Sequence, residues 1–265
     1  MIVDKTKFGV SFFDGSFGGV YRGRQVLCSG RHGTGKSIFA CHFLNQALQD
    51  GDKALLLSNY RAQDTVIVAE SLGMPFADAV TNGQLTILEY TSFIPESNAS
   101  ANVMLPPQSF MELQETVESQ SIRRIVFDTV LPWVAIHPVS RIAEHVYSFI
   151  HAIERLGVTA LLTLPKPVSN PAFTLKSRLE DLCPIAVNLE NTADQRVLRV
   201  TKYLGEMRNL SAPYPFTIVQ RKGIVAQDAE PELPGQAREP APAGSAAPPP
   251  PQKRINFSSV IRFPD

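Results

Sequence analysis

The chain has 265 residues, and its 25 Lys and Arg balance its 25 Asp and Glu, so no global electrostatic attraction to DNA or to a membrane surface is expected. Its apolar runs are too short or too charged to span a bilayer, and its 44% hydrophobic content suits one large α/β core with a tail. Residues 1–5 lack the pattern of a secretory signal, and Cys28, Cys41 and Cys183 fit neither a disulfide framework nor a metal site. We therefore expect a cytoplasmic protein.

Short β-rich apolar runs alternate with helix-like stretches over the first two thirds of the chain, which is typical of βαβ units and a mostly parallel sheet. We expect strands at 26–29, 54–58, 85–89, 124–128 and 159–164, with helices at 36–49, 63–72, 107–119 and 140–156. Farther on, the segments 185–191, 196–203 and 215–225 have strand composition without a helix between them. This change predicts antiparallel strands that extend the sheet.

The composition changes near Ala226. The segment 226–252 is rich in Pro, Ala, Gly and charged residues and is predicted to be a disordered linker, because it cannot bury enough apolar surface to fold. The last segment, 253–265, regains β-branched and aromatic residues, and its part Phe257–Phe263 is a candidate peptide for binding a protein partner. A loose chain end is the alternative. The sequence thus predicts a folded domain at 1–225, a linker and a C-terminal interaction peptide.

One motif carries strong chemical information. The segment 30–37 has the spacing G-x-x-x-x-G-K-S between an expected strand and an expected helix, where backbone N–H groups and a helix N-terminus can surround a phosphate. We predict that its eight residues bind a nucleotide: Gly30, Arg31, His32, Gly33, Thr34, Gly35, Lys36 and Ser37. Lys36 would place its charge at the β- and γ-phosphates, and the Ser37 hydroxyl would bind Mg²⁺. A glycine-rich turn that binds nothing is the alternative.

A second Mg²⁺ ligand is expected at the end of a neighbouring strand. Asp128 follows the apolar run 124–127 and is the candidate. An aspartate that caps the next segment is the competing interpretation.

Several segments around these motifs resemble the KaiC-like ATPases of the RecA superfamily. The opening 8–23, with Asp14 and its glycines, is similar to the start of those proteins, and 69–88, 197–202 and 214–224 resemble their second helix, third strand and closing strands. The resemblance covers about residues 8 to 225. It implies a RecA-like fold, ATP and Mg²⁺ as ligands, and assembly into a homo-oligomer.

The chain departs from this family where hydrolysis is concerned. The family has two glutamates after its second strand that polarise the attacking water, and here Tyr60 and Arg61 fall at their place. Neither side chain is an effective base near neutral pH, so an assistance of about 10²- to 10⁴-fold is missing. Asp64 is either a substitute base or a cap of the following helix.

The chain departs from the family a second time at the end of the expected strand 196–203. The family sends a lysine and an arginine, spaced K-x-R, into the nucleotide site of a neighbouring subunit, and here Lys202 is kept while Leu204 replaces the arginine. An arginine in that role is worth about 10³- to 10⁵-fold in turnover. Lys202 is therefore a candidate trans-acting residue, with an ordinary strand lysine as the alternative.

These features predict an ATP-binding regulatory or assembly module with weak or absent hydrolysis. One alternative is a DNA recombination or repair accessory, since Lys166, Phe173, Lys176 and Arg178 lie in a segment, 165–178, where RecA-like recombinases place a DNA-contacting loop. The neutral chain disfavours it. Another alternative is an active ATPase with an unidentified base. A long polar connection at 91–108 is a further candidate for partner contact.

Overall fold

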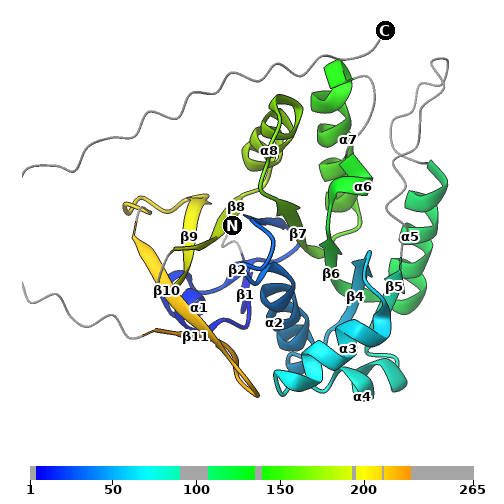
Figure 1. The fold of residues 1–265 in the computed structure, drawn as a ribbon. Coiled ribbons are helices and arrows are strands. Elements are labelled where there is room, and N and C mark those ends of the chain that lie inside the picture. The colour runs from blue at the N-terminus through cyan, green and yellow to red at the C-terminus, as the bar shows by residue number, and fades with distance from the viewer. Residues whose placement is uncertain (1–3, 90–106, 135–138, 193–194, 211, 228–265) are drawn as a thin grey trace, which may run out of the picture. The chain divides into compact units, whose positions relative to one another are not determined.

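The structure is a computed structural model that describes residues 4–89, 107–134, 139–192, 195–210 and 212–227 (Figure 1). Its helices are α1 (Ser11–Phe17), α2 (Lys36–Gln49), α3 (Ala62–Ser71), α4 (Phe76–Thr81), α5 (Pro107–Gln120), α6 (Leu131–Val134), α7 (Ile142–Arg155) and α8 (Asn170–Leu182), with a 3-10 turn η1 at Val139–Arg141. None of these described helices has the length and apolar character needed to cross a membrane.

A nine-stranded sheet forms the centre of the described fold, in the order β11-β10-β9-β8-β3-β7-β6-β4-β5. The strands are β3 (Gln25–Gly30), β4 (Lys53–Ser58), β5 (Leu85–Glu89), β6 (Ile122–Asp128), β7 (Thr159–Pro165), β8 (Ile185–Asn191), β9 (Arg196–Tyr203), β10 (Pro213–Val219) and β11 (Gly223–Ala226). Neighbours from β8 to β5 run parallel, and β9, β10 and β11 are antiparallel. A separate antiparallel pair joins β1 (Lys5–Thr6) to β2 (Val20–Tyr21).

Helices cover both faces of the sheet, which explains why its central strands are apolar along their whole length (Figure 1). Side chains alternate between the faces along a strand, so Val26 and Cys28 pack in the core with α1 and α2, whereas Leu27 packs in the core with α7 and α8. The strands are thus held from both sides, and their carboxyl ends form a rigid edge.

The structure confirms the predicted α/β class, with a mostly parallel sheet and antiparallel strands near the C-terminal end. The predicted helix at 36–49 coincides with α2, and the predicted helix at 107–119 differs from α5 by one residue. The segment 215–225, expected to have strand structure, lies in the antiparallel hairpin of β10 and β11. The first strand of the expected antiparallel extension, β8, is parallel to β3. Helices α1, α4, α6 and α8 were not predicted.

The prediction of a loop at 165–178 is wrong for most of that segment, because helix α8 occupies Asn170–Leu182. Ser169 and Pro171 stand at the start of this helix, and proline is favoured there because its missing N–H has no partner to lose. Since α8 connects β7 to β8, it also provides the crossover that a parallel β8 requires.

A buried arginine joins three parts of the chain at the amino end of the sheet. Arg124 on β6 is 1% exposed and pairs with Asp50 and with Asp52, the latter at 3.2 Å. Its guanidinium also donates to the Thr6 hydroxyl at 2.7 Å and to the Lys7 carbonyl at 3.0 Å. Strand β6, the end of α2 and the first described residues are therefore linked through one fully paired cation.

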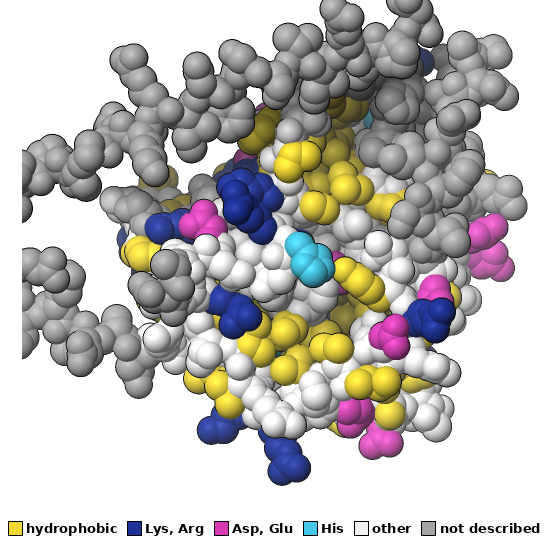
Figure 2. Space-filling view, in the orientation of Figure 1, with side chains coloured by type: hydrophobic (Ala, Val, Ile, Leu, Met, Phe, Trp, Pro, Cys, Tyr) yellow, Lys and Arg dark blue, Asp and Glu magenta, His cyan; other side chains and the backbone are white. Residues whose placement is uncertain are grey.

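Acidic and apolar side chains share one side of the surface, which belongs to α3, α4, β5 and α5 (Figure 2). Exposed acids there are Asp64, Glu70, Asp78, Glu89, Glu112, Glu115 and Glu118, and exposed apolar residues are Ile67, Val68, Val80, Leu88 and Met111. At the other end of the described sheet, the β9–β10 connection exposes Leu204, Met207 and Arg208. Since Arg208 is paired with Glu206 at 2.6 Å, the acidic excess lies on the α3–β5 side, while both ends expose apolar side chains.

Some predicted segments lie outside the described residues. These are residues 91–106 of the polar connection expected at 91–108, whose last two residues begin α5, and, from residue 228 onward, the rest of the expected linker and the C-terminal peptide with Phe257–Phe263. The domain boundaries proposed from composition stay predictions.

Candidate functional site

A cleft of about 590 Å³ lies at the carboxyl ends of β3, β4, β6 and β7. This is the edge of a parallel α/β sheet at which ligands bind, because connecting loops and helix N-termini converge there. The described residues that line it are His32, Gly33, Gly35, Lys36, Ser37, Ile38, Asn59, Tyr60, Val68, Asp128, Thr129, Thr163, Pro165, Arg196 and Ile218. Both the glycine-rich loop and the strand-end aspartate predicted from the sequence therefore reach one cleft.

The backbone conformation of the loop from Gly30 to Lys36 depends on its glycines. Gly33 and Gly35 have φ angles of 76° and 102°, which strongly favour glycine. A Cβ on Gly30 would lie 2.5 Å from the carbonyl oxygen of Leu189 on β8. The chain can therefore curl tightly at this point and begin α2 directly after it.

Lys36 is the first residue of α2 and lies beneath the loop. Its Nζ donates to the carbonyl oxygens of Gly30 at 3.0 Å and Arg31 at 2.8 Å. Burial lowers the pKa of this ammonium, and the nearby Cys28 and Asp128 oppose that shift. The lysine is thus held at the base of the cleft, where its donors can exchange carbonyl oxygens for phosphate oxygens.

Not every residue of the motif lines the cleft. Five do so, whereas Gly30, Arg31 and Thr34 do not. Thr34 is buried and donates through its hydroxyl to the Arg31 carbonyl at 2.9 Å, which braces the loop. The sequence motif therefore contains residues that contact the cleft and residues that shape the loop.

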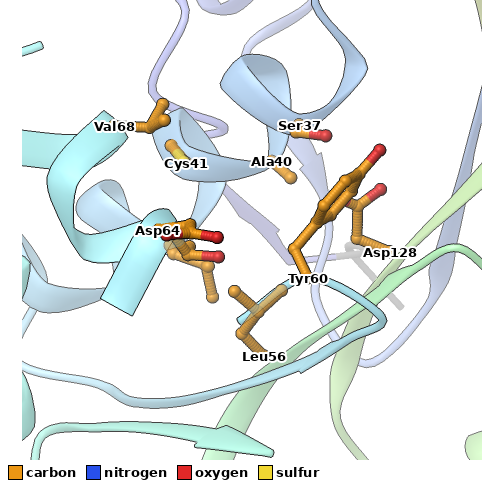
Figure 3. Close-up of a pocket in the computed structure, with 10 residues that line it drawn as sticks. Ser37, Ala40, Cys41, Leu56, Tyr60, Asp64, Val68 and Asp128 are labelled. Carbon is orange, nitrogen blue, oxygen red and sulfur yellow. The ribbon is translucent and has the colours of Figure 1, made fainter. Parts of the chain in front are cut away.

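Asp128 lies at the end of β6 and is 7% exposed. Its Oδ1 accepts a hydrogen bond from the Thr163 hydroxyl of β7 at 2.6 Å, which orients the carboxylate. Ser37 lines the same cleft, and Figure 3 shows its hydroxyl and the Asp128 carboxylate near the Tyr60 phenol. A hydroxyl and a carboxylate are the oxygen ligands that suit Mg²⁺ when phosphates complete its shell.

The residues after β4 differ from the sequence expectation. Tyr60 lines the cleft, as does Asn59, but Arg61 does not: it is exposed and stands at the N-cap of α3. The pair that faces the cleft is therefore Asn59 and Tyr60, because the turn after β4 sends Arg61 outward. Neither residue carries a carboxylate, and Asp128 is the sole acidic residue among the described residues that line the cleft.

A smaller cavity of about 220 Å³ adjoins the cleft between α2 and α3 (Figure 3). It is lined by Ser37, Ala40, Cys41, Leu44, Leu56, Tyr60, Asp64, Thr65, Val68 and Asp128. Tyr60 forms part of both walls, whereas Asp64 faces this cavity and not the cleft. The interpretation of Asp64 as a helix cap is also wrong, because α3 begins at Ala62, whose N–H donates to Glu89 at 2.7 Å.

Lys202 has partners within the described chain. Its Nζ donates to the carbonyl oxygens of Glu180 at 2.7 Å and Asp181 at 2.8 Å, the last turn of α8. A cation is favoured at this end of a helix because it meets unpaired carbonyl groups. A role for Lys202 in a neighbouring subunit stays a prediction, and it would require these bonds to be exchanged.

The basic residues considered for DNA contact are largely paired. On α8, Lys176 pairs with Glu180, and Arg178 lies 3.6 Å from Asp181. Phe173 is 53% exposed on the same helix. The positive charge of this helix is therefore offset locally by its own acids.

Several residues that line the cleft carried no site prediction from the sequence, among them Thr163, Arg196 and Ile218. Arg196 and Ile218 belong to β9 and β10, which are distant in sequence from the loop. The position of Arg196 could have indicated its place. It begins a predicted strand directly after another predicted strand, so it lies at the edge of the sheet where β8 ends.

The chain is similar to proteins of one family. A family model described as "ATPase: KaiC" matches residues 6–230. The circadian clock oscillator protein KaiC of Synechococcus elongatus is 26% identical over 216 residues, 78% of this chain and 41% of that protein. KaiC of Nostoc sp. is 24% identical over 226 residues, 82% and 43% of the two chains. The chain thus spans less than half the length of these curated relatives.

A solved structure has the same fold. The KaiC-like protein from the hyperthermophilic archaeon Pyrococcus horikoshii OT3 superposes with a TM-score of 0.68 at 23% identity. The match covers 85% of this chain and 99% of the other. At this identity the likeness concerns the fold.

Proposed function

The chain belongs to the KaiC ATPase family and is a RecA-like ATP-binding module; from that premise, we propose that it binds ATP with Mg²⁺, hydrolyses it slowly, and uses its nucleotide state to control self-assembly or partner binding. The observation that supports this proposal is a division within one cleft. Lys36, Ser37 and Asp128, the residues that would hold phosphate and metal, line this cleft, and the lining residues after β4 are Asn59 and Tyr60. Nucleotide affinity can persist without fast turnover when only groups specific to the transition state are missing.

Each group has a distinct part in binding. The loop amides and the start of α2 attract the phosphates, and Lys36 adds a full charge beside them. Ser37 and Asp128 would hold Mg²⁺, with Thr163 fixing the carboxylate through its 2.6 Å hydrogen bond. When bound, Mg²⁺ neutralises phosphate charge. Tyr60 lines the cleft with a phenol and supplies no carboxylate to act as a base.

We also propose that copies of the chain assemble head to tail. The α3–β5 side exposes apolar residues among acids, and the β9–β10 connection exposes Leu204 and Met207 next to Arg208. Two different surfaces that complement each other give a heterologous contact, which closes into a ring when the rotation permits. Because Glu206 pairs with Arg208 at 2.6 Å, the apolar side chains of the two surfaces would carry this contact.

The C-terminal peptide is proposed as a tethered contact for a protein partner or a second copy. The Pro- and Ala-rich composition of 226–252 favours a tether that would raise the effective concentration of Phe257–Phe263 near the folded domain. The proposed location is the cytoplasm, where the three free and buried cysteines would stay reduced.

Calorimetry, ATP turnover and particle mass, measured together, test the function. Full-length protein should bind Mg·ATP, Lys36→Ala should lose binding, and truncation after Val225 should keep binding but change assembly or partner capture. Equal nucleotide binding by the full-length protein and Lys36→Ala would place the ligand elsewhere and reject the proposal.

The two other functions make different demands. A DNA accessory should retain DNA at moderate salt in a nucleotide-dependent way, but the paired cations of α8 do not favour it. An active ATPase would need a base such as Asp64, which faces the apolar cavity. We therefore propose slow ATP hydrolysis in preference to DNA binding or fast ATP turnover.

A further inference from the structure

The cavity between α2 and α3 differs in its chemistry from the cleft that it adjoins. The cleft is lined by the cations Lys36 and Arg196. The smaller cavity, of about 220 Å³, has no lysine, arginine or histidine among the described residues that line it. Six of its lining residues do not reach the cleft: Ala40, Cys41, Leu44, Leu56, Asp64 and Thr65. The cavity is therefore a separate space whose charge is opposite to that of the phosphate-binding groups.

The inner wall of this cavity is apolar. Ala40, Cys41 and Leu44 are buried residues of α2, and Leu56 is buried on β4. Figure 3 shows Val68 of α3 on the same wall. An apolar cavity of about 150 Å³ is large enough to bind benzene. The space between α2 and α3 can thus hold one ring with a short substituent.

One end of the cavity is acidic. Asp64 is exposed in the first turn of α3, and Figure 3 shows its side chain directed from α3 toward Leu56 and Tyr60. Its carboxylate has no hydrogen-bond or ion-pair partner among the described residues. Asp128, which is 7% exposed, adds a second carboxylate to the lining. This charge attracts a cationic ligand and repels an anionic one.

We propose that this cavity is a second ligand site, which binds a small apolar molecule carrying one amino group. The apolar body lies among the side chains of α2 and β4, where its burial supplies the affinity. The ammonium group pairs with the Asp64 carboxylate at the solvent-exposed end, which selects the charge of the ligand. Because Ser37, Tyr60 and Asp128 line both spaces, the occupant lies beside the residues proposed to bind Mg²⁺.

Ligand-observed NMR titration of the full-length protein with three one-ring probes tests this assignment. Benzylamine and benzyl alcohol are matched in size, and benzoate carries the opposite charge. Benzylamine should bind about 5-fold more tightly than benzyl alcohol, the gain that an ion pair open to solvent can supply, and benzoate should not bind. Equal affinities of benzylamine and benzyl alcohol, or no binding of benzylamine, would overturn the proposal.

Asp64→Asn tests the charged end of the site. This variant should bring the affinities of benzylamine and benzyl alcohol within about 2-fold of each other, because the ion pair is lost. Asp78→Asn is the matched control, since Asp78 is an exposed acid in the first turn of α4 and does not line the cavity. It should keep the preference for benzylamine. Loss of the preference in both variants would assign it to the general acidity of this surface and overturn the site.

Ala40→Leu tests the apolar end. Benzylamine and benzyl alcohol should both bind at least about 10-fold more weakly, because a close-packed wall has no room for both the larger side chain and the ring. If Ala40→Leu does not fold, Val68→Phe replaces it with the same expectation, since Val68 is 41% exposed and tolerates a larger side chain more readily. Unchanged binding of both probes would place them elsewhere and overturn the site.

Lys36→Ala separates this site from the nucleotide site. Lys36 lines the cleft but not the smaller cavity, so the variant should lose Mg·ATP while it binds benzylamine with unchanged affinity. Loss of benzylamine binding in Lys36→Ala would show that the probe occupies the cleft, and it would overturn the second site. Binding of benzylamine without any binding of Mg·ATP by the unaltered protein would reject the proposed function alone.

Discussion

Two arginines at opposite ends of the sheet show how the same side chain is used for stability and for a ligand site. Arg124, at the amino end of β6, is 1% exposed and has carboxylate, hydroxyl and carbonyl acceptors. Arg196, at the edge where β6 ends in Asp128, has a buried Nε without an acceptor among the described residues. The acceptors around Arg124 make it part of the fold, whereas Arg196 is only partly buried and its Nε has no acceptor in the described chain.

The largest expected effect is on ATP turnover, from a change at Tyr60, which lines the cleft where a catalytic carboxylate is expected in the family. Tyr60→Glu places a carboxylate in the cleft and should raise ATP turnover by about 10²-fold or more, because general-base assistance contributes about 10²- to 10⁴-fold. Steady-state phosphate release measures this. Arg61→Glu is the matched control and should give no gain, since Arg61 does not line the cleft. A gain in Arg61→Glu alone would contradict the geometry of the turn after β4.

Arg124 should be a stability residue without effect on the cleft. Arg124→Met should cost about 3–5 kcal/mol of unfolding free energy, because it leaves the Asp50 and Asp52 carboxylates without their cation. Arg123→Met, an exposed arginine of the same strand, should change stability by less than about 0.5 kcal/mol. Urea denaturation compares the two. Equal costs for both variants would refute the stabilising role of the buried cluster.

Acidification should weaken the fold through His42. In its neutral form, Nδ1 donates to the Gly9 carbonyl at 2.9 Å, and Nε2 accepts from the Ile224 N–H at 2.7 Å. Burial lowers the pKa of His42, although the Gly9 bond opposes the shift. The unfolded chain therefore takes up a proton first, so stability present above about pH 6.5 is lost as the pH falls below it.

Denaturation at pH 7.5 and pH 5.5 measures this slope. His42→Gln should reduce the loss on acidification, because glutamine does not titrate. An identical pH dependence in both proteins would show that His42 does not contribute.

The smallest expected effect belongs to Asp64. Its position on the apolar cavity predicts that Asp64→Asn leaves ATP turnover within about 2-fold. A loss of about 10²-fold would identify Asp64 as the base and favour the alternative of an active ATPase.

Local patterns predicted those parts of the fold and site that are contiguous in sequence. The loop, the beginning of α2 and the strand that ends in Asp128 each carry their own signal of glycines, apolar runs and a following polar residue. The parallel β8 was missed because α8 was read as a loop: its Ser169–Asn170–Pro171 start is polar and proline-containing, yet these residues also favour a helix N-terminus.

Contacts between distant segments could not be predicted. Arg196 reaches the cleft only because β8 and β9 add to the sheet beside β3, and the backbone turn after β4 decides that Asn59 rather than Arg61 faces inward. Likewise, a strand pattern does not reveal that Lys202 caps α8. These properties depend on register and on turn geometry.

A single-turnover experiment tests the central claim, tight binding with slow cleavage, most directly. Excess protein is mixed with limiting Mg·ATP, and the amounts of bound ATP and released phosphate are measured over time. The account predicts that ATP binds in the full-length protein, fails to bind in Lys36→Ala, and is cleaved well below about 1 s⁻¹, the low end of ordinary enzyme rates. Cleavage at or above that rate in the unaltered protein would contradict it.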